Sequence, residues 1–179
     1  SRPHKGISYL IETARHLPPD APIHFLLLGR LENDKTLKRL IAQSPCRDRI
    51  HLPGFRNDAP AVFAACNTFV MPSTKREGLS RAVIEAMAYA TPPIVTDVGG
   101  LPELVADGQS GYVVPPEHAE AIAKAIFKLY SKPGAAHQMG LNAQHRIRTT
   151  FNIANTIEQT IALFDNLMEK TPGKNQDRR

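Results

Sequence analysis

The sequence predicts an α/β fold of the Rossmann-like kind, in which a parallel sheet lies between two layers of helices. The first observation is the order of the elements, because short apolar runs alternate with longer helical segments along most of the chain. Strands that alternate with helices form parallel sheets through right-handed crossovers. The second observation is that runs such as residues 23–28 are apolar almost without interruption, as in strands that helices cover on both faces. We therefore expect one three-layer α/β/α domain over residues 1–170.

Each expected strand is an apolar run that ends at a glycine, a proline or a polar turn. Residues 23–28 end at Gly29, and the short run 50–52 ends at Pro53-Gly54. The later runs end in the same way, and glycine and proline are the strongest breaks in a strand pattern. The remaining strands are expected at residues 68–71, 94–97 and 112–114.

The helices are expected where apolar residues recur every three or four positions. In residues 7–17 they form one stripe, and Pro18-Pro19 ends that helix. Asp34 is placed to cap a helix that continues to about residue 44. The chain opens on a helix, as if the first strand of the fold preceded Ser1. Further helices are expected at residues 57–65, 79–90, 101–106, 117–131, 133–149 and 153–170. Residues 171–179 are expected to form a disordered tail.

Composition is that of an ordinary soluble globular domain. Hydrophobic residues make up 42% and charged residues 22% of the 179 positions. No apolar run approaches the ~20 residues of a membrane span, and residues 1–6 lack the hydrophobic core of a signal peptide. Cys46 and Cys66 have no CxxC spacing, which favours a reducing cytoplasm over a disulfide framework or a cysteine zinc site.

Charge and histidine content argue against two other classes of partner. The net charge is +5, yet the lysines and arginines are scattered and no basic tract or RNP-type aromatic motif occurs, so no nucleic-acid partner is expected. The seven histidines have no metal-ligand spacing, so no metal site is expected. Walker A, GxGxxG and Ser-His-Asp patterns are absent from the sequence.

The chemistry is expected at the carboxyl ends of the strands, where α/β sheets bind their ligands. Glu77 follows the strand at residues 68–71, and Glu85 lies eight positions further on, about two turns along the next helix at ~3.6 residues per turn. Gly78 lets a ligand approach the backbone, and the first amides of a helix have no intrahelical acceptors. Free amides attract oxyanions, whereas carboxylates accept hydrogen bonds from hydroxyls. This stretch therefore suits a ligand that carries both phosphate and sugar hydroxyls.

Each of these residues also has a purely structural interpretation. Glu77 fits a charge that a helix dipole favours, and Glu85 fits a structural salt bridge on an apolar helix. Lys5 fits a solvated lysine, and Arg81 fits a surface residue as well as a phosphate contact. Gly99-Gly100 fits a tight turn at the exit of a strand.

The ordered motifs around Glu77 resemble those of a known family. Glu77 and Glu85, with seven residues between them, resemble the E-x7-E motif of the retaining glycosyltransferases with the GT-B fold, family 4 in particular. Enzymes of this family have two Rossmann-like domains around a cleft, and the chain resembles the C-terminal, nucleotide-sugar-binding domain over roughly residues 3–165. The other matching motifs stand in the family's order: Pro3-His4-Lys5-Gly6, Pro72-Ser73, Pro93-Ile94-Val95, Gly99-Gly100-Leu101-Pro102-Glu103 and Asp107-Gly108-Gln109-Ser110-Gly111.

The resemblance implies roles at the sugar and diphosphate end of the donor. Glu77 would contact hydroxyls of the donor sugar close to the reacting centre. Lys5 would stabilise charge on the departing diphosphate, as transition-state electrostatics requires. The amides of Gly78, Leu79 and Ser80 would hold sugar or diphosphate oxygens.

The resemblance also implies roles at the nucleoside end and shows two departures from the family pattern. Glu85 would accept hydrogen bonds from the ribose hydroxyls, and the backbone of Gly54-Phe55 would face the base. Family members commonly carry an arginine several residues before the lysine that helps to bind the diphosphate, whereas Arg2 lies only three residues before Lys5. Either Arg2 takes that role in donor binding, or the true partner belongs to the strand expected before Ser1. Ser80 stands where many members have a glycine, which alters the contacts with the donor sugar.

The implied activity is retaining transfer of a sugar from a UDP- or GDP-sugar to a glycan or lipid-linked acceptor. No metal or other cofactor is expected, because basic side chains and helix-start amides offset the charge of the diphosphate. The acceptor site would belong to an N-terminal domain, so the chain alone is expected to bind nucleotide but to transfer little. The implied location is the cytoplasm, with peripheral association at the inner face of a bacterial membrane.

Two alternatives remain open from the sequence. One is a Rossmann-like nucleotide-binding or interaction module without transfer activity. The other is a GT-B-fold epimerase or phosphorylase, although a phosphorylase would need a pyridoxal-phosphate lysine, for which no motif is present. In a two-domain enzyme the last helix is expected to cross towards the N-terminal domain. It would then expose apolar residues in this chain: Ile157, Ile161, Phe164 and Leu167.

Overall fold

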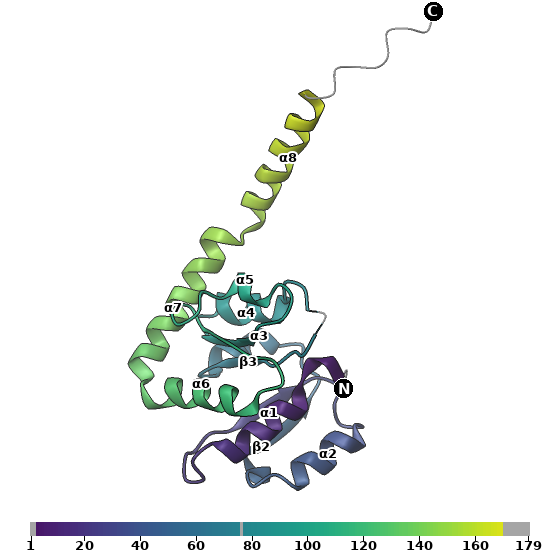
Figure 1. The fold of residues 1–179 in the computed structure, drawn as a ribbon, viewed down its shortest axis with the longest axis vertical. Helices are drawn as coiled ribbons and strands as arrows, with labels where there is room; N and C mark the ends of the chain where they lie inside the picture. Colours follow the sequence, from purple (N-terminus) through teal and green to yellow (C-terminus); the bar gives the residue numbers. More distant parts are fainter. Residues whose placement is uncertain (1–2, 76, 170–179) are drawn as a thin grey trace, which may run out of the picture.

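The computed structural model describes residues 3–75 and 77–169. The predictions for Arg2 and for a disordered tail at residues 171–179 therefore lie outside the described residues. Figure 1 shows the strands and most helices gathered into one body, from which α8 (Ile153–Glu169) extends.

All strand pairs in the described part of the chain are parallel, which confirms the predicted α/β class. One ladder pairs β1 (Phe25–Leu28) with β2 (Ile50–Gly54). A second ladder has the order β3 (Phe69–Met71), β4 (Pro93–Thr96) and β5 (Tyr112–Val114). The strands therefore form two parallel ladders, and among the described residues β1 and β3 do not pair with each other.

The helices cover the second ladder on both faces. Ile94 belongs to a core cluster with α1 (Ile7–Thr13) and α6 (Ala119–Ser131), whereas its neighbour Val95 packs with α4 (Arg81–Ala88) and α7 (Pro133–Thr150). Successive strand residues point to opposite faces, so this alternation shows the three predicted layers. The remaining helices are α2 (Lys35–Ala42), α3 (Ala59–Ala65) and α5 (Leu101–Leu104), with 3₁₀ turns at Pro3–Lys5, Ala14–His16 and Arg47–Arg49.

The β1–β2 ladder differs from the prediction of a strand covered on both faces. Along β1, Phe25 and Leu27 are buried while Leu26 between them is 43% exposed. The reason is that the core cluster around α4 and α7 contains no residue of β1 or β2. Only the face towards α1 and α6 is therefore covered within the described residues.

Most helix boundaries lie close to their predicted positions, and two local signals act as expected. The Asp34 carboxylate accepts a hydrogen bond of 2.9 Å from the amide of Leu37 and caps α2. Gly140 allows α7 to approach α4, because a Cβ at this position would lie 2.0 Å from the carbonyl oxygen of Ala90. The helix predicted at residues 79–90 begins later, at Arg81, since Ser80 has an extended backbone.

Helix α8 exposes the apolar residues that the sequence singled out. Their exposed fractions are 51% for Ile157, 55% for Ile161, 63% for Phe164 and 53% for Leu167. Within the described residues, no helix combines the length and the apolar character that crossing a bilayer requires.

Candidate functional site

Lys5 and Glu77 form an ion pair at the end of β3. The Lys5 Nζ lies 2.9 Å from Oε1 and 2.8 Å from Oε2 of Glu77, so both carboxylate oxygens accept a hydrogen bond from it. The Glu77 side chain is 10% exposed and that of Lys5 is 34% exposed. Two residues that lie 72 positions apart in the sequence, and that the sequence analysis expects at one ligand, are thus in contact.

The backbone around Lys5 is fixed by the loop that follows β3. The amide of Thr74 donates a 2.8 Å hydrogen bond to the carbonyl oxygen of His4. Gly6 has a φ of 65°, and a Cβ there would lie 1.8 Å from the carbonyl oxygen of Pro72. Only glycine fits such a close approach in the left-handed region. The turn at Pro3–Lys5 is therefore held against the carboxyl end of β3.

The backbone of Glu77 is held by the loop that follows β4. The amide of Gly100 donates a 3.1 Å hydrogen bond to the Glu77 carbonyl oxygen. Gly99 has a φ of 58°, and a Cβ on it would lie 1.8 Å from the same oxygen. The tight exit turn inferred from the sequence is therefore present, and it also supports Glu77. Two consecutive glycines directly after a strand were the signal for this contact.

Ser73 holds the Glu77 side chain from the protein interior, a contact that the sequence did not reveal. Its Oγ donates a 2.8 Å hydrogen bond to Oε2 of Glu77. Ser73 is fully buried, and its carbonyl oxygen accepts a 2.5 Å hydrogen bond from Oγ1 of the equally buried Thr96. The only sequence signal was the position of Ser73 in the motif Pro72-Ser73.

The backbone amides of residues 78–80, directly after Glu77, are the next element of the candidate site. The amides of Gly78, Leu79 and Ser80 donate to no acceptor among the described residues. Gly78 and Leu79 are exposed, and a Cβ at Gly78 would meet nothing within 4 Å. Ser80 is 6% exposed and is the N-cap of α4, although its side chain makes no capping hydrogen bond. Unpaired amides before a helix suit an oxyanion.

Glu85 lies on the side of α4 that faces away from the core. Its side chain is 40% exposed, and its Oε1 lies 3.6 Å from Nη2 of Arg81, whose side chain is 92% exposed. The salt bridge considered from the sequence is therefore present, but exposed i,i+4 pairs contribute only ~0.3–0.5 kcal/mol. The Glu85 carboxylate remains accessible to hydroxyls of a ligand, while the neighbouring Ala86 and Met87 are fully buried.

Gly54 and Phe55 lie at the carboxyl end of β2. Gly54 has a φ of 79°, and its carbonyl oxygen accepts a 3.0 Å hydrogen bond from the amide of Gly29. Phe55 is 60% exposed, and the guanidinium carbon of Arg30 lies 5.4 Å from the centre of its ring. An exposed aromatic ring under a cation offers a flat surface for a planar group.

An exposed ion pair follows this surface. Arg56 donates to both carboxylate oxygens of Asp58, from Nε at 2.8 Å and from Nη2 at 2.5 Å. This hydrogen bonding lowers the pKa of the Asp58 carboxyl below its ordinary value. Asp58 is therefore ionised over the whole neutral range.

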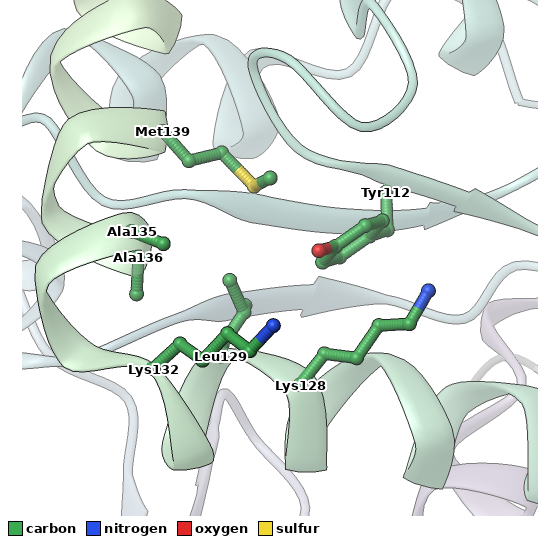
Figure 2. Close-up of a pocket in the computed structure, with 7 residues that line it drawn as sticks. All are labelled: Tyr112, Lys128, Leu129, Lys132, Ala135, Ala136 and Met139. Atoms are coloured by element: carbon green, nitrogen blue, oxygen red, sulfur yellow. The ribbon is translucent and has the colours of Figure 1, made fainter.

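Taken together, these groups include the Lys5 ammonium, backbone amides without an acceptor in the described part of the chain, and the carboxylates of Glu77 and Glu85. A cation with amides can bind a diphosphate, and carboxylates can bind hydroxyls. No group of three or more potential metal ligands occurs among residues 3–75 and 77–169. A separate cavity of about 250 Å³ lies between β5, α6 and α7. Figure 2 shows its lining residues, among them Tyr112, Lys128 and Lys132. None of the predicted site residues lines that cavity.

The comparisons with known proteins point to one family. The family described as glycosyl transferases group 1 matches residues 1–146. The chain is 28% identical over 166 residues to the MMP alpha-(1->4)-mannosyltransferase of Mycolicibacterium hassiacum, covering 91% of this chain and 40% of that protein. It is 30% identical to the alpha-maltose-1-phosphate synthase of Mycolicibacterium smegmatis, covering 89% of this chain and 44% of that protein. The chain thus spans less than half the length of these relatives.

Solved structures give the same result for the fold. The structure of Anabaena Alr3699/HepE in complex with UDP has a TM-score of 0.82 and 28% identity, covering 92% of this chain and 46% of that chain. The C-terminal domain of the glycosyl transferase group 1 family protein LpcC from Francisella tularensis has a TM-score of 0.76 and 27% identity, with 86% of this chain and 83% of that chain covered. The chain therefore belongs to the glycosyl transferases group 1 family, and its Rossmann-like α/β fold is that of a C-terminal half of a GT-B glycosyltransferase.

Proposed function

We propose that this chain is the donor-binding domain of a retaining glycosyltransferase that uses a UDP- or GDP-sugar. The observation that carries the proposal is the Lys5–Glu77 ion pair beside the free amides of Gly78, Leu79 and Ser80. These groups match the chemistry of a sugar diphosphate, since a cation and amides bind oxyanions while a carboxylate binds hydroxyls. The UDP-bound structure of Anabaena Alr3699/HepE supports UDP as the first nucleotide to test.

Each predicted residue has a place in the proposed complex. Lys5 and the amides after Glu77 contact the diphosphate, and Glu77 contacts hydroxyls of the sugar. Glu85 binds the ribose hydroxyls, and the backbone of Gly54-Phe55 contacts the base. Arg2 contacts the diphosphate next to Lys5. The proposed reaction requires no metal, because protein cations and amides offset the phosphate charge.

The rest of the enzyme is proposed to supply the acceptor site for a glycan or lipid-linked acceptor. The relatives are more than twice as long as this chain, which supports a second domain. The exposed residues Ile157 and Phe164 on α8 suit contacts with such a domain. We propose that the chain alone transfers little, and that the whole enzyme works in the cytoplasm or at the inner face of a membrane.

Calorimetric titration of this chain with UDP, GDP, UDP-glucose and GDP-mannose tests the proposal. We expect one nucleotide series to bind. Glu85→Ala should weaken binding about 10-fold or more, because a hydrogen bond to a charged group contributes ~1.5–3 kcal/mol and 1.4 kcal/mol is tenfold in affinity. Glu158→Ala on α8 is the matched control, since it removes an exposed glutamate outside the site. Absence of binding to all four compounds would sink the proposal.

A transfer assay with the full-length enzyme separates the remaining alternatives. Transfer with retention of the anomeric configuration supports the proposed reaction. Nucleotide binding without any transfer would instead support a binding module, which is one of the two alternatives left open by the sequence.

A further inference from the structure

The Glu77 carboxylate has two partners that differ in how firmly they are held. Lys5 reaches it with a long side chain that is 34% exposed. Ser73 reaches it with a hydroxyl on a residue that is fully buried. Lys5 contacts both oxygens, at 2.9 and 2.8 Å, whereas Ser73 donates to Oε2 alone, at 2.8 Å.

Ser73 is fixed by the sheet rather than by the loop it begins. It follows β3 after Pro72, and its carbonyl oxygen accepts a 2.5 Å hydrogen bond from Thr96 at the end of β4. Thr96 is fully buried and so has little freedom to move. A hydroxyl on a buried residue is costly to leave without an acceptor, and Oε2 of Glu77 is the acceptor it has. The orientation of the carboxylate is therefore tied to the core of the second ladder.

Donor binding should affect the Lys5 contact with Glu77 but not the Ser73 contact. Under the proposed function, on which this inference rests, the Lys5 ammonium is also the cation that meets the diphosphate. An ammonium that is shared with a diphosphate holds the Glu77 carboxylate less firmly. The hydrogen bond from Ser73 competes with no ligand, because Ser73 is inaccessible to solvent.

We propose that Ser73 is a positioning residue for donor binding, which orients the Glu77 carboxylate through Oε2 and leaves Oε1 to accept a hydroxyl of the donor sugar. Oε1 is the natural choice for the sugar, because among residues 3–75 and 77–169 its only partner is the ammonium of Lys5. Ser73 itself does not contact the ligand. Its effect should therefore appear on the sugar part of the donor and not on the nucleotide part.

Ser73→Ala in this chain tests the proposal, because it should change the affinity for a nucleotide-sugar and leave the affinity for the nucleoside diphosphate unchanged. For the nucleotide-sugar that the wild type binds most tightly among UDP-glucose and GDP-mannose, we expect affinity to fall about tenfold, the size of one hydrogen bond to a charged group. For the corresponding nucleoside diphosphate without sugar, we expect no change. Ser110→Ala is the matched control: Ser110 is 2% exposed, and its hydroxyl bonds the backbone of Ala106 instead of an ionised side chain.

A double substitution distinguishes positioning from general damage to the fold. In the Glu77→Ala background, where the side chain has no acceptor for the Ser73 hydroxyl, Ser73→Ala should have no further effect on sugar binding if it acts through the carboxylate. In the same four variants, the shifts in the urea-unfolding midpoint should be non-additive, because the two side chains are in direct contact. The second readout requires no ligand.

Three results would overturn the inference. One is an equal loss of affinity for the nucleotide-sugar and the bare nucleoside diphosphate in Ser73→Ala. Another is a full effect of Ser73→Ala when Glu77 is already changed to alanine. The third is additivity of the two stability shifts, which decides against the inference even if the wild-type chain binds no nucleotide-sugar. In that last case the proposed function fails separately, on the titration of the wild type.

Discussion

Gly99 offers the sharpest stability test of how the site is built, because its backbone lies directly against Glu77. Its φ is 58°, in the left-handed region, and a Cβ built on it would lie 1.8 Å from the Glu77 carbonyl oxygen. The obstructing atom belongs to the backbone, so it cannot be moved by rotating a side chain. Gly99→Ala therefore has to displace either the loop after β4 or the segment that carries Glu77.

The expected loss of stability is the sum of two costs. A non-glycine residue in the left-handed region costs roughly 1–2 kcal/mol. Moving the backbone until the contact is tolerable adds strain of about 1–3 kcal/mol. The free energy of unfolding should therefore fall by about 2–5 kcal/mol, a large part of the total for a small domain.

Gly108→Ala isolates the first cost from the second. Gly108 has a φ of 71°, close to that of Gly99, but a Cβ on it would meet nothing within 4 Å. This variant should lose only the conformational cost, about 1–2 kcal/mol. The difference between the two variants is thus the free energy of the clash with Glu77.

Urea unfolding of both variants, monitored by circular dichroism, measures this difference in the free energy of unfolding. The slope of that free energy against urea concentration is compared with the wild-type slope for each variant. We expect Gly99→Ala to be less stable than Gly108→Ala by at least about 1 kcal/mol. Equal unfolding midpoints for the two variants would refute the reasoning, because they would mean that the loop gives way without strain.

The remaining predictions concern the core, one ion pair and one thiol. Leu101→Ala should destabilise the chain by about 3 kcal/mol because Leu101 is fully buried, whereas Ile161→Ala on α8 should stay within about 0.5 kcal/mol in the same urea assay. Arg56→Gln should raise the pKa of Asp58 towards its ordinary value, since the hydrogen bond from Arg56 is the main cause of the lowering, and a carboxyl carbon NMR titration measures it. Burial raises the pKa of the Cys66 thiol, so at pH 8 it should react more slowly with iodoacetamide than a free cysteine, as mass spectrometry over time would record.

The fold could be predicted from the sequence wherever the signal is local. Apolar runs located the strands, and Asp34 located the start of α2 through its capping hydrogen bond. The open face of β1 could not be predicted in the same way. Leu26 and Leu27 are both leucines, yet Leu27 is buried in the core cluster with α1 and α6, whereas the cluster around α4 and α7 contains no residue of β1 and Leu26 is exposed. Burial on a particular face is a property of the tertiary packing.

The sequence singled out Glu77 by residue type and spacing, but it did not reveal which residues contact it. Glu77 and Gly78 lie in one stretch, so their neighbourhood follows from the sequence. The partners of the Glu77 side chain come from separate elements, with Lys5 from the turn before α1 and Ser73 from the end of β3. Its backbone partner, Gly100, follows β4. No local pattern states which loops meet, so the support of Glu77 required the structure.

The Lys5–Glu77 ion pair explains how an ionised glutamate is tolerated at the largely buried end of β3. A carboxylate that is only 10% exposed is costly without a partner, and Lys5 supplies one in this structure. In the proposed complex the diphosphate draws on the same ammonium, and the sugar hydroxyls then become hydrogen-bond donors to the carboxylate. With a complete donor, the sugar hydroxyls thus supply hydrogen bonds to Glu77 in place of those from the Lys5 ammonium that the diphosphate binds. A bare nucleotide binds the ammonium but supplies no such hydroxyls. This exchange favours the complete donor over the spent nucleotide, which is the preference that a transferase needs.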